Sequence, residues 1–309
     1  AAKFSGKTKN GWSMGLLESV TGKMYAEFDN NGQRREEIVE PLTHSLVGRL
    51  QKEFNERNSF IVGILTSTNL RLEGSLDFLR KNAYTGGIDF RHSWKNREYY
   101  IKGNIVSSHI NGSAEAIENT QRNITHLFQR TDASHVEVDP NRTSLTGTGG
   151  KINFGKAGGG NWRYEMGGFW RSPELELNDV GFLRQADDIR QFANLQYRFL
   201  KPTQWYRNAN LTLSHSTAFD FEGNYNRIQY DFNGFVSFQN NGFAEGGAAH
   251  KPRIYSNTVL RGGPRWRWAE ENFYYLFLGT DSRKKFNATI GYVNSQAQQD
   301  NFSLKRYVL

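Results

Sequence analysis

Apolar and polar residues alternate most clearly between Asn226 and Gly247. One set of alternate positions holds Ile228, Tyr230, Phe232, Val236 and Phe238, with Gly234 among them. The other set holds Gln229, Asp231, Asn233, Ser237 and Gln239, broken only by Phe235. Because a strand sends successive side chains to opposite faces, this pattern predicts a two-faced β-strand. The turn that follows, Asn240-Asn241-Gly242, is favoured by residues that tolerate positive φ.

The same pattern recurs along almost the whole chain and predicts about fourteen strands, paired as hairpins. The predicted hairpins span residues 3–21, 45–68, 83–108, 144–171, 187–216, 226–250 and 271–292, and 302–309 is predicted as a strand begun and not finished. Residues 113–130 depart from the pattern. Ile117, Ile124, Leu127 and Phe128 lie near helical spacing there, which predicts a short amphipathic helix in a long loop. Such a helix could cap or plug the strands, or lie on the surface.

The predicted connections alternate in length. Tight turns fall near residues 10, 56, 96, 157, 202, 241 and 283, whereas the segments between hairpins run from roughly ten to over thirty residues. Transmembrane β-barrels show this asymmetry, with short periplasmic turns and long extracellular loops. Aromatic residues also gather at the tight turns, as in an interfacial girdle: Phe54, Phe60, Trp94, Tyr99, Phe154, Trp162, Phe199, Trp205, Phe238 and Phe243. A soluble β-sandwich has shorter strands and no reason to place aromatics at one end.

These features predict an all-β fold, a transmembrane antiparallel up-and-down β-barrel. Composition agrees, since only 37% of residues are hydrophobic while 14% are aromatic and 31 are Gly. The longest apolar run, residues 60–65, is far shorter than the ~20 residues of a membrane helix, so only strands could span a bilayer. The absence of Cys excludes disulfides and thiolate metal sites.

The net charge of +8 first suggests nucleic-acid binding. However, Lys and Arg are scattered along the chain among 31 acidic residues, which favours an ordinary basic surface or a polar lumen. No nucleic-acid partner is therefore predicted.

Several motifs carry a family resemblance. They are the run Lys3-Phe4-Ser5-Gly6-Lys7-Thr8, the run from Gly11 to Leu17, Gly181-Phe182-Leu183-Arg184, Arg261-Gly262-Gly263-Pro264 and Asp281-Ser282-Arg283-Lys284. Over nearly its whole length the chain resembles the barrel family of Bacteroidota called domain of unknown function 5916. The resemblance implies a preceding carbohydrate-binding-like domain of the family-9 type and a barrel that continues past this chain. It implies no catalytic residues.

Candidate sites are few. The charged residues predicted to point into the barrel are Asp89, Arg91, Lys102, Arg163, Glu165, Arg190 and Asp231. They could form an ordinary network of charges in the lumen, or they could make the lumen selective for a charged or sugar-like solute. The loop motif Arg261, Gly262, Gly263 and Pro264 fits either a lumenal constriction or, more simply, a sharp bend. A loop calcium at Asp132, Asp139 and Asn141 is a further hypothesis, although the spacing is not that of an EF-hand.

The seven His residues form no H-x-H or H-E-x-x-H motif. By strand parity His92, His109 and His215 share the apolar face, near strand ends. A hydrolase site built from Ser214, His215 and Asp220 is conceivable, but such a site needs inward-pointing side chains.

We therefore predict that residues 1–309 form one outer-membrane β-barrel domain, incomplete at both ends, in a bacterial outer membrane. Its expected partners are outer-membrane lipid and lipopolysaccharide, with carbohydrate and other envelope proteins as further candidates. No catalytic site, cofactor or metal is expected. The predicted role is passage of a solute, or a membrane scaffold for an envelope complex. The alternative is a barrel-anchored surface protein that binds or processes carbohydrate.

Overall fold

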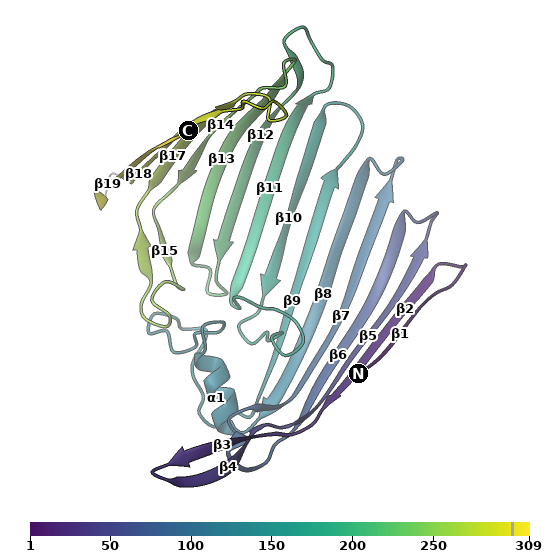
Figure 1. The fold of residues 1–309 in the computed structure, drawn as a ribbon, viewed down its shortest axis with the longest axis vertical. Helices are drawn as coiled ribbons and strands as arrows, with labels where there is room; N and C mark the ends of the chain where they lie inside the picture. Colours follow the sequence, from purple (N-terminus) through teal and green to yellow (C-terminus); the bar gives the residue numbers. More distant parts are fainter. Residues whose placement is uncertain (298–299) are drawn as a thin grey trace.

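The computed structural model describes residues 1–297 and 300–309, which form an antiparallel all-β fold with 19 strands and one short α-helix. Fifteen strands build one sheet in which each strand pairs with its neighbours along the chain (Figure 1). In spatial order they are β1 (Ala2–Lys7), β2 (Trp12–Thr21), β5 (Leu42–Phe54), β6 (Ser59–Arg71), β7 (Arg80–Trp94), β8 (Tyr99–Gly112), β9 (Ser144–Lys156), β10 (Trp162–Arg171), β11 (Asp188–Phe199), β12 (Tyr206–Phe219), β13 (Tyr225–Phe238), β14 (Phe243–Lys251), β17 (Glu271–Gly279), β18 (Thr289–Ala297) and β19 (Phe302–Val308).

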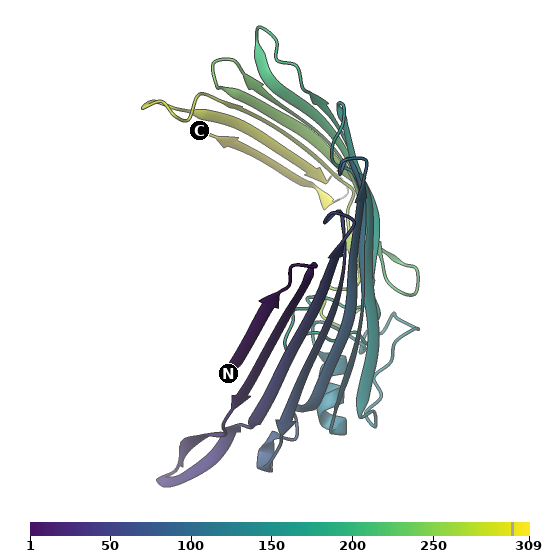
Figure 2. The same ribbon diagram turned by 90° about the vertical axis from the view of Figure 1, so that its right-hand side faces the viewer.

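The sheet is strongly curved but not closed. Strands β1 and β19 form its two edges, and Figure 2 shows them on separate arms of the curve. No helix in the part of the chain that the structure describes is long and apolar enough to cross a membrane.

Two short ladders were missed in the sequence. Strands β3 (Met24–Asn30) and β4 (Gln33–Glu40) form a hairpin inside the segment expected to be a polar loop. Its turn places Asn31 and Gly32 at φ 55° and 83°. The charged run at residues 34–37 fills both faces of β4, so no alternation marks it as a strand. Strands β15 (Ile254–Ser256) and β16 (Trp266–Trp268) are only three residues each, which is too short for a period to emerge.

Tight turns and long connections lie at opposite ends of the strands (Figure 1). The longer connections are 22–41, 72–79, 113–143, 172–187 and 252–270. Two connections differ from expectation. Strand β12 continues to Phe219, beyond its predicted end at residue 216, and leaves only residues 220–224 before β13, while the turn between β17 and β18 covers 280–288. We call the two ends the turn end and the loop end.

The helix is shorter than predicted: α1 spans Ala114–Arg122. Ser113 caps its start, because its hydroxyl accepts a hydrogen bond from the Ala116 N–H at 3.0 Å. The side chain of Asn123 then accepts hydrogen bonds from the N–H groups of Thr125 and His126, which turns the chain out of the helix. Ile124, which was expected on the apolar stripe, is consequently 60% exposed.

The two hydrophobic clusters lie between the loop-end segments and one face of the sheet. Ile117, Phe128 and Val136 of the 113–143 segment pack on strand residues Ala83, Ile110 and Leu145. Leu175, Leu183 and Ala186 of the 172–187 segment pack near Val106. Ala83, Ile110 and Leu145 are direct register partners on β7, β8 and β9, so they share a face. We call it the loop-covered face, and the opposite one the open face.

The open face is mainly apolar, and no segment in residues 1–297 or 300–309 forms a covering layer over it. Its exposed side chains include Leu16, Leu50, Ile61, Leu65, Ile88, Ile105, Ile152, Met166, Leu213, Phe232, Leu276 and Ile290, each at least 45% exposed. The sheet is thus two-faced, as the alternation predicts, with its apolar side exposed.

Candidate functional site

All seven charged residues predicted to point inward lie on the loop-covered face. The strand register establishes this, because each is in step with Ala83, Ile110 or Leu145 through unbroken pairings: Asp89 with Asn104, Arg91 with Lys102, Glu165 with Gly155, Arg163 with Gln196, Arg190 with Phe169 and Asp231 with Ser214. They are spread over β7 to β13 and do not converge on one point. Whether this face lines a lumen stays a prediction.

Among the seven, direct contact joins Lys102 to Glu165, with 3.2 Å between the Nζ and Oε1 atoms. The amide of Asn153 donates a hydrogen bond to the same carboxylate. Arg163 instead donates to backbone carbonyls of its own turn, at 2.9 Å from the oxygen of Gly160. Asp231 accepts a hydrogen bond of 2.7 Å from Gln229. These contacts fix individual side chains on the sheet surface rather than assembling a catalytic constellation.

The predicted aromatic residues form chains of ring contacts along the turn end. Trp94 stacks on Tyr99 with centroids 5.8 Å apart and also meets Phe154. Trp162 packs edge-on against Tyr197 at 4.9 Å, and Tyr197 in turn packs against Phe199. Farther along, Trp205 meets Tyr206 at 4.6 Å and Phe238 at 6.5 Å. The rings therefore form a band at one level of β7 to β13.

The aromatic residues of the band do not all lie on the same face of the sheet. Phe54, Trp94, Tyr99, Trp162, Phe199 and Phe238 have the parity of the open face. Phe60 and Phe243 have the parity of the loop-covered face, because they pair with Arg91 and Ser237 respectively. An aromatic residue next to a turn can belong to either face, and sequence position alone did not separate the two.

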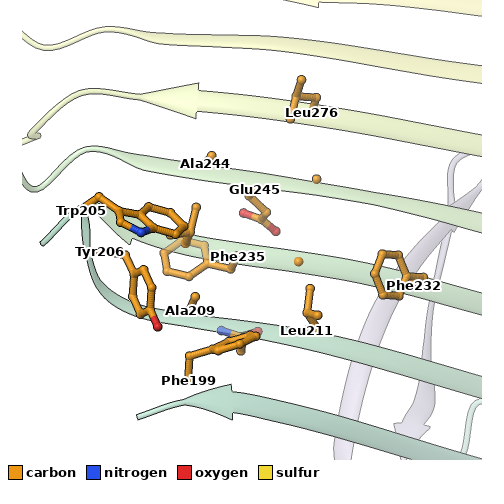
Figure 3. A pocket seen from close by; sticks show the side chains of 14 residues that line it. Phe199, Trp205, Tyr206, Ala209, Leu211, Phe232, Phe235, Ala244, Glu245 and Leu276 are labelled. Carbon is orange, nitrogen blue, oxygen red and sulfur yellow. The ribbon is translucent and has the colours of Figure 1, made fainter. Parts of the chain in front are cut away.

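A groove of about 590 Å³ lies beside this band (Figure 3). Leu211, Phe232 and Leu276 line it, with Phe199 and Trp205 at one end. Gly234 and Gly246 are directly paired across β13 and β14, so no side chain fills the space between those walls. The groove is mainly apolar and presents no cluster of groups suited to acid–base or nucleophilic chemistry.

A buried ionic cluster lies at the loop end. The side chain of Arg130 is 1% exposed and donates to the carboxylate of Asp187, while its other terminal nitrogen lies 3.8 Å from Asp220. Asp220 is fully buried and accepts a hydrogen bond from Arg265. The four residues come from the 113–143, 172–187, 220–224 and 252–270 segments, so two arginines and two aspartates tie four connections together. We call this group the loop-end cluster.

Two further side chains border the loop-end cluster. His135 contacts Asp187 with a separation of 2.9 Å between the Nε2 and Oδ1 atoms. Glu222 accepts hydrogen bonds from the hydroxyl and the N–H of Ser134, and these hold the pKa of its carboxyl below the ordinary value.

A second buried group surrounds Glu176, which is 1% exposed. Burial alone would raise the pKa of its carboxyl, but His126, the charge of Arg80 and the N–H of Asn178 together lower it to about 2. Arg80 also lies 3.2 Å from Asp179, whose pKa burial raises. This group anchors the 172–187 segment to the start of β7 and to the residues that follow α1.

The motif from Arg261 to Pro264 forms a tight turn between β15 and β16. Arg261 and Gly262 have φ of 49° and 106°. Glycine is favoured there by its conformation, and a Cβ atom at Gly262 would come 2.5 Å from the Gln129 amide, so a larger residue would also displace the Gln129 side chain. This geometry is that of the sharp bend, the simpler of the two interpretations.

The residues of the hydrolase and calcium hypotheses do not come together as a site. Ser214 and His215 point to opposite faces, and His215 stacks on Tyr230 at 4.7 Å. Asp220 is engaged by arginines of the loop-end cluster. Asp132 contacts Arg265, whereas Asp139 accepts a hydrogen bond from its neighbour Asn141, so the three proposed calcium ligands serve other contacts. Within residues 1–297 and 300–309, no cluster of three or more His, Asp or Glu side chains suited to a metal ion is found.

Sequence reasoning missed the loop-end cluster. Its members lie in segments without periodicity, and Arg130 is 57 residues from Asp187 along the chain. A usable signal was present in Asp187-Asp188, two acidic residues at the start of a strand, where unpaired burial would be costly.

The fold and site define a meandering antiparallel sheet with one polar face held under ordered loops and one apolar face left open. The chain matches the family model described as domain of unknown function (DUF5916) over residues 1–308, and it belongs to that family. No significant match is found among curated proteins.

Proposed function

We propose that this sheet is part of the wall of an outer-membrane β-barrel, and that its polar face lines a route for a solute. The observation that carries the proposal is the open face. Contiguous exposed apolar surface on a soluble monomer seldom exceeds a few hundred Å², whereas here apolar side chains from β2 to β18 form an uncovered layer. Contact with lipid removes that layer from water.

Strand length and aromatic placement support the same proposal. A barrel strand needs about 9–11 tilted residues to cross a bilayer, and β5 to β9 have 13 to 15. The aromatic band at the turn end then lies at the level of the lipid headgroups. In the proposed barrel the edges of β1 and β19 are paired, because an unpaired strand edge in lipid would leave backbone groups without partners.

In this proposal the loop-covered face is lumenal and the loop-end segments cover one mouth on the extracellular side. The lipid partners are outer-membrane lipid and lipopolysaccharide, and no enzymatic activity is assigned. If the covered mouth prevents passage, the same barrel serves instead as a membrane scaffold for envelope proteins.

Two adjacent residues test membrane insertion. Leu65 lies on the open face and Thr66 on the loop-covered face, since they pair with Gly86 and Thr85. Leu65→Arg places a charge in lipid and should cost about 2–4 kcal/mol of insertion free energy; Thr66→Arg, the matched control, should cost far less. The measurement is the yield of folded, protease-resistant protein in the outer-membrane fraction. Recovery of the wild-type protein in the soluble fraction, or equal yields of the two variants, would overturn the proposal.

Ion conductance of the full chain in a planar bilayer tests the route itself. Stable open steps are expected if the polar face lines a pathway. If the folded, inserted protein gives no conductance, solute passage is ruled out and the scaffold role is the proposal that stands.

A further inference from the structure

Positive charge predominates on the central part of the loop-covered face. Two carboxylates, Glu165 and Asp188, neutralise only part of it. Lys102 is balanced by Glu165. Asp188 is shared by two guanidinium groups, at 3.8 Å from Arg171 and 3.0 Å from Arg190, so one of these positive charges remains in excess.

Four further cations on β7 to β11 lie within 4.0 Å of no carboxylate in the described part of the chain: Arg91, Lys151, Arg163 and Arg198. Arg91 and Arg198 contact neutral side chains, with hydrogen bonds to Ser93 and Gln196. The one additional acid on this face of the same strands is Asp89. The sheet surface between β7 and β11 therefore carries a net positive charge.

Aromatic rings hold part of this charge in place. One register row runs from Lys151 through Phe169 to Arg190. The guanidinium of Arg190 lies 5.4 Å from the Phe169 ring centroid, and Lys151 lies 5.7 Å from the Phe192 ring. A phenyl face attracts a cation without neutralising its charge. Lys151 is exposed and Arg190 partly so, which leaves both accessible to a solute.

We infer that the solute taken by this face is an anion, carrying carboxylate, phosphate or sulfate groups. The inference rests on the proposed function and specifies its substrate class. A surface lined by one sign of charge raises the local concentration of the opposite ion, and rings of Arg and Lys select anions in pores. The row Lys151–Phe169–Arg190 supplies the strongest contact, because it offers charge from two strands beside a planar apolar surface.

The test is the reversal potential of the full chain in a planar bilayer under a KCl gradient at low ionic strength, where screening is weakest. Wild-type steps should favour chloride. Lys151→Gln and Arg91→Gln should each lower the chloride-to-potassium permeability ratio about fourfold, because one unit charge about 8 Å away in water changes the local concentration of each ion by about a factor of two, in opposite directions. Lys151→Glu should lower it further.

Lys52→Gln is the matched control. It removes the same charge from the open face, where Lys52 lies over the Trp12 ring, and should leave the selectivity unchanged. Steps that favour potassium, or a selectivity insensitive to Lys151 and Arg91, would overturn the anion inference alone. A silent bilayer would overturn solute passage and the inference with it.

Discussion

The turn end and the loop end of this sheet are held by different kinds of interaction. At the turn end, a few consecutive residues suffice: Asn55, Glu56 and Arg57 all have positive φ, and the N–H of Asn58 bonds back to Asn55 at 2.8 Å. At the loop end, stability depends on buried charges that meet from distant segments, such as Asp220 and Arg265. The turn end is therefore specified by local sequence and the loop end by contacts of the finished fold. Substitutions at the two ends should differ in how much stability they cost and in how far along the chain their effects extend.

The largest effect is expected at Arg130. Arg130→Met leaves Asp187 and Asp220 buried without their shared cation and should cost about 3–5 kcal/mol in the loop-end segments. Amide hydrogen exchange should then accelerate in residues 113–143 and 252–270 while the turn end is unchanged. The control is Arg122→Met, because the exposed pair of Arg122 with Glu118 contributes at most about 0.5 kcal/mol. Equal protection in the two variants would show that the loop-end cluster does not hold the loops.

The next effect is pH-dependent and centres on Glu176. Its folded-state pKa of about 2 lies below the ordinary value of 4.5, so the stabilisation is present above about pH 4.5 and is lost as the pH falls towards 2. The full contribution is about 3 kcal/mol. The neighbouring Asp179, whose pKa is raised, offsets part of the loss.

Proteolysis of the 172–187 segment against pH measures this contribution. Glu176→Gln should make cleavage faster at neutral pH and flatten its dependence between pH 4.5 and 2. Glu137→Gln changes an exposed carboxyl and should leave the profile as in the wild type. A steep profile in Glu176→Gln would assign the acid sensitivity to other groups.

The smallest effect is expected at the turn end. Asn241 has φ of 65°, so Asn241→Val should cost about 1–2 kcal/mol, whereas Asn241→Gly fits the same backbone. Both variants lose the hydrogen bond to Asp281, so their difference isolates backbone strain. Denaturant unfolding of the refolded protein gives the two values. A valine variant as stable as the glycine variant would show that this turn relaxes freely.

The same contrast explains what sequence reasoning could reach. Alternation such as that of Ile228 to Gln239 depends on the chain alone, and the structure confirms an all-β antiparallel fold with those strands. The family assignment from the N-terminal and loop motifs is also confirmed. The helix was predicted in the correct place but too long. Hydrogen bonds to the Asn123 side chain end it, and hydrophobic periodicity does not reveal such bonds.

Other features could not be predicted from a pattern in the sequence. The face to which Phe60 or Phe243 belongs is set by register at the turn, and the partners of Arg130 are set by the meeting of four loops. Closure of the sheet, its insertion in a membrane and the solute all stay predictions, for which the variants above provide tests.

The order of strands has a consequence for how the molecule assembles. Since each strand of the main sheet pairs with its neighbour in sequence, hairpins can add one after another with short loop closures, a route of low contact order. The loop-end cluster cannot follow that route, because Asp220 also pairs with Arg265, which lies beyond β14 in the chain. Until then Asp220 has only one of its two arginine partners. The loop-end cluster can therefore be completed, and the loops fixed in place, only after the sheet has formed beyond β14.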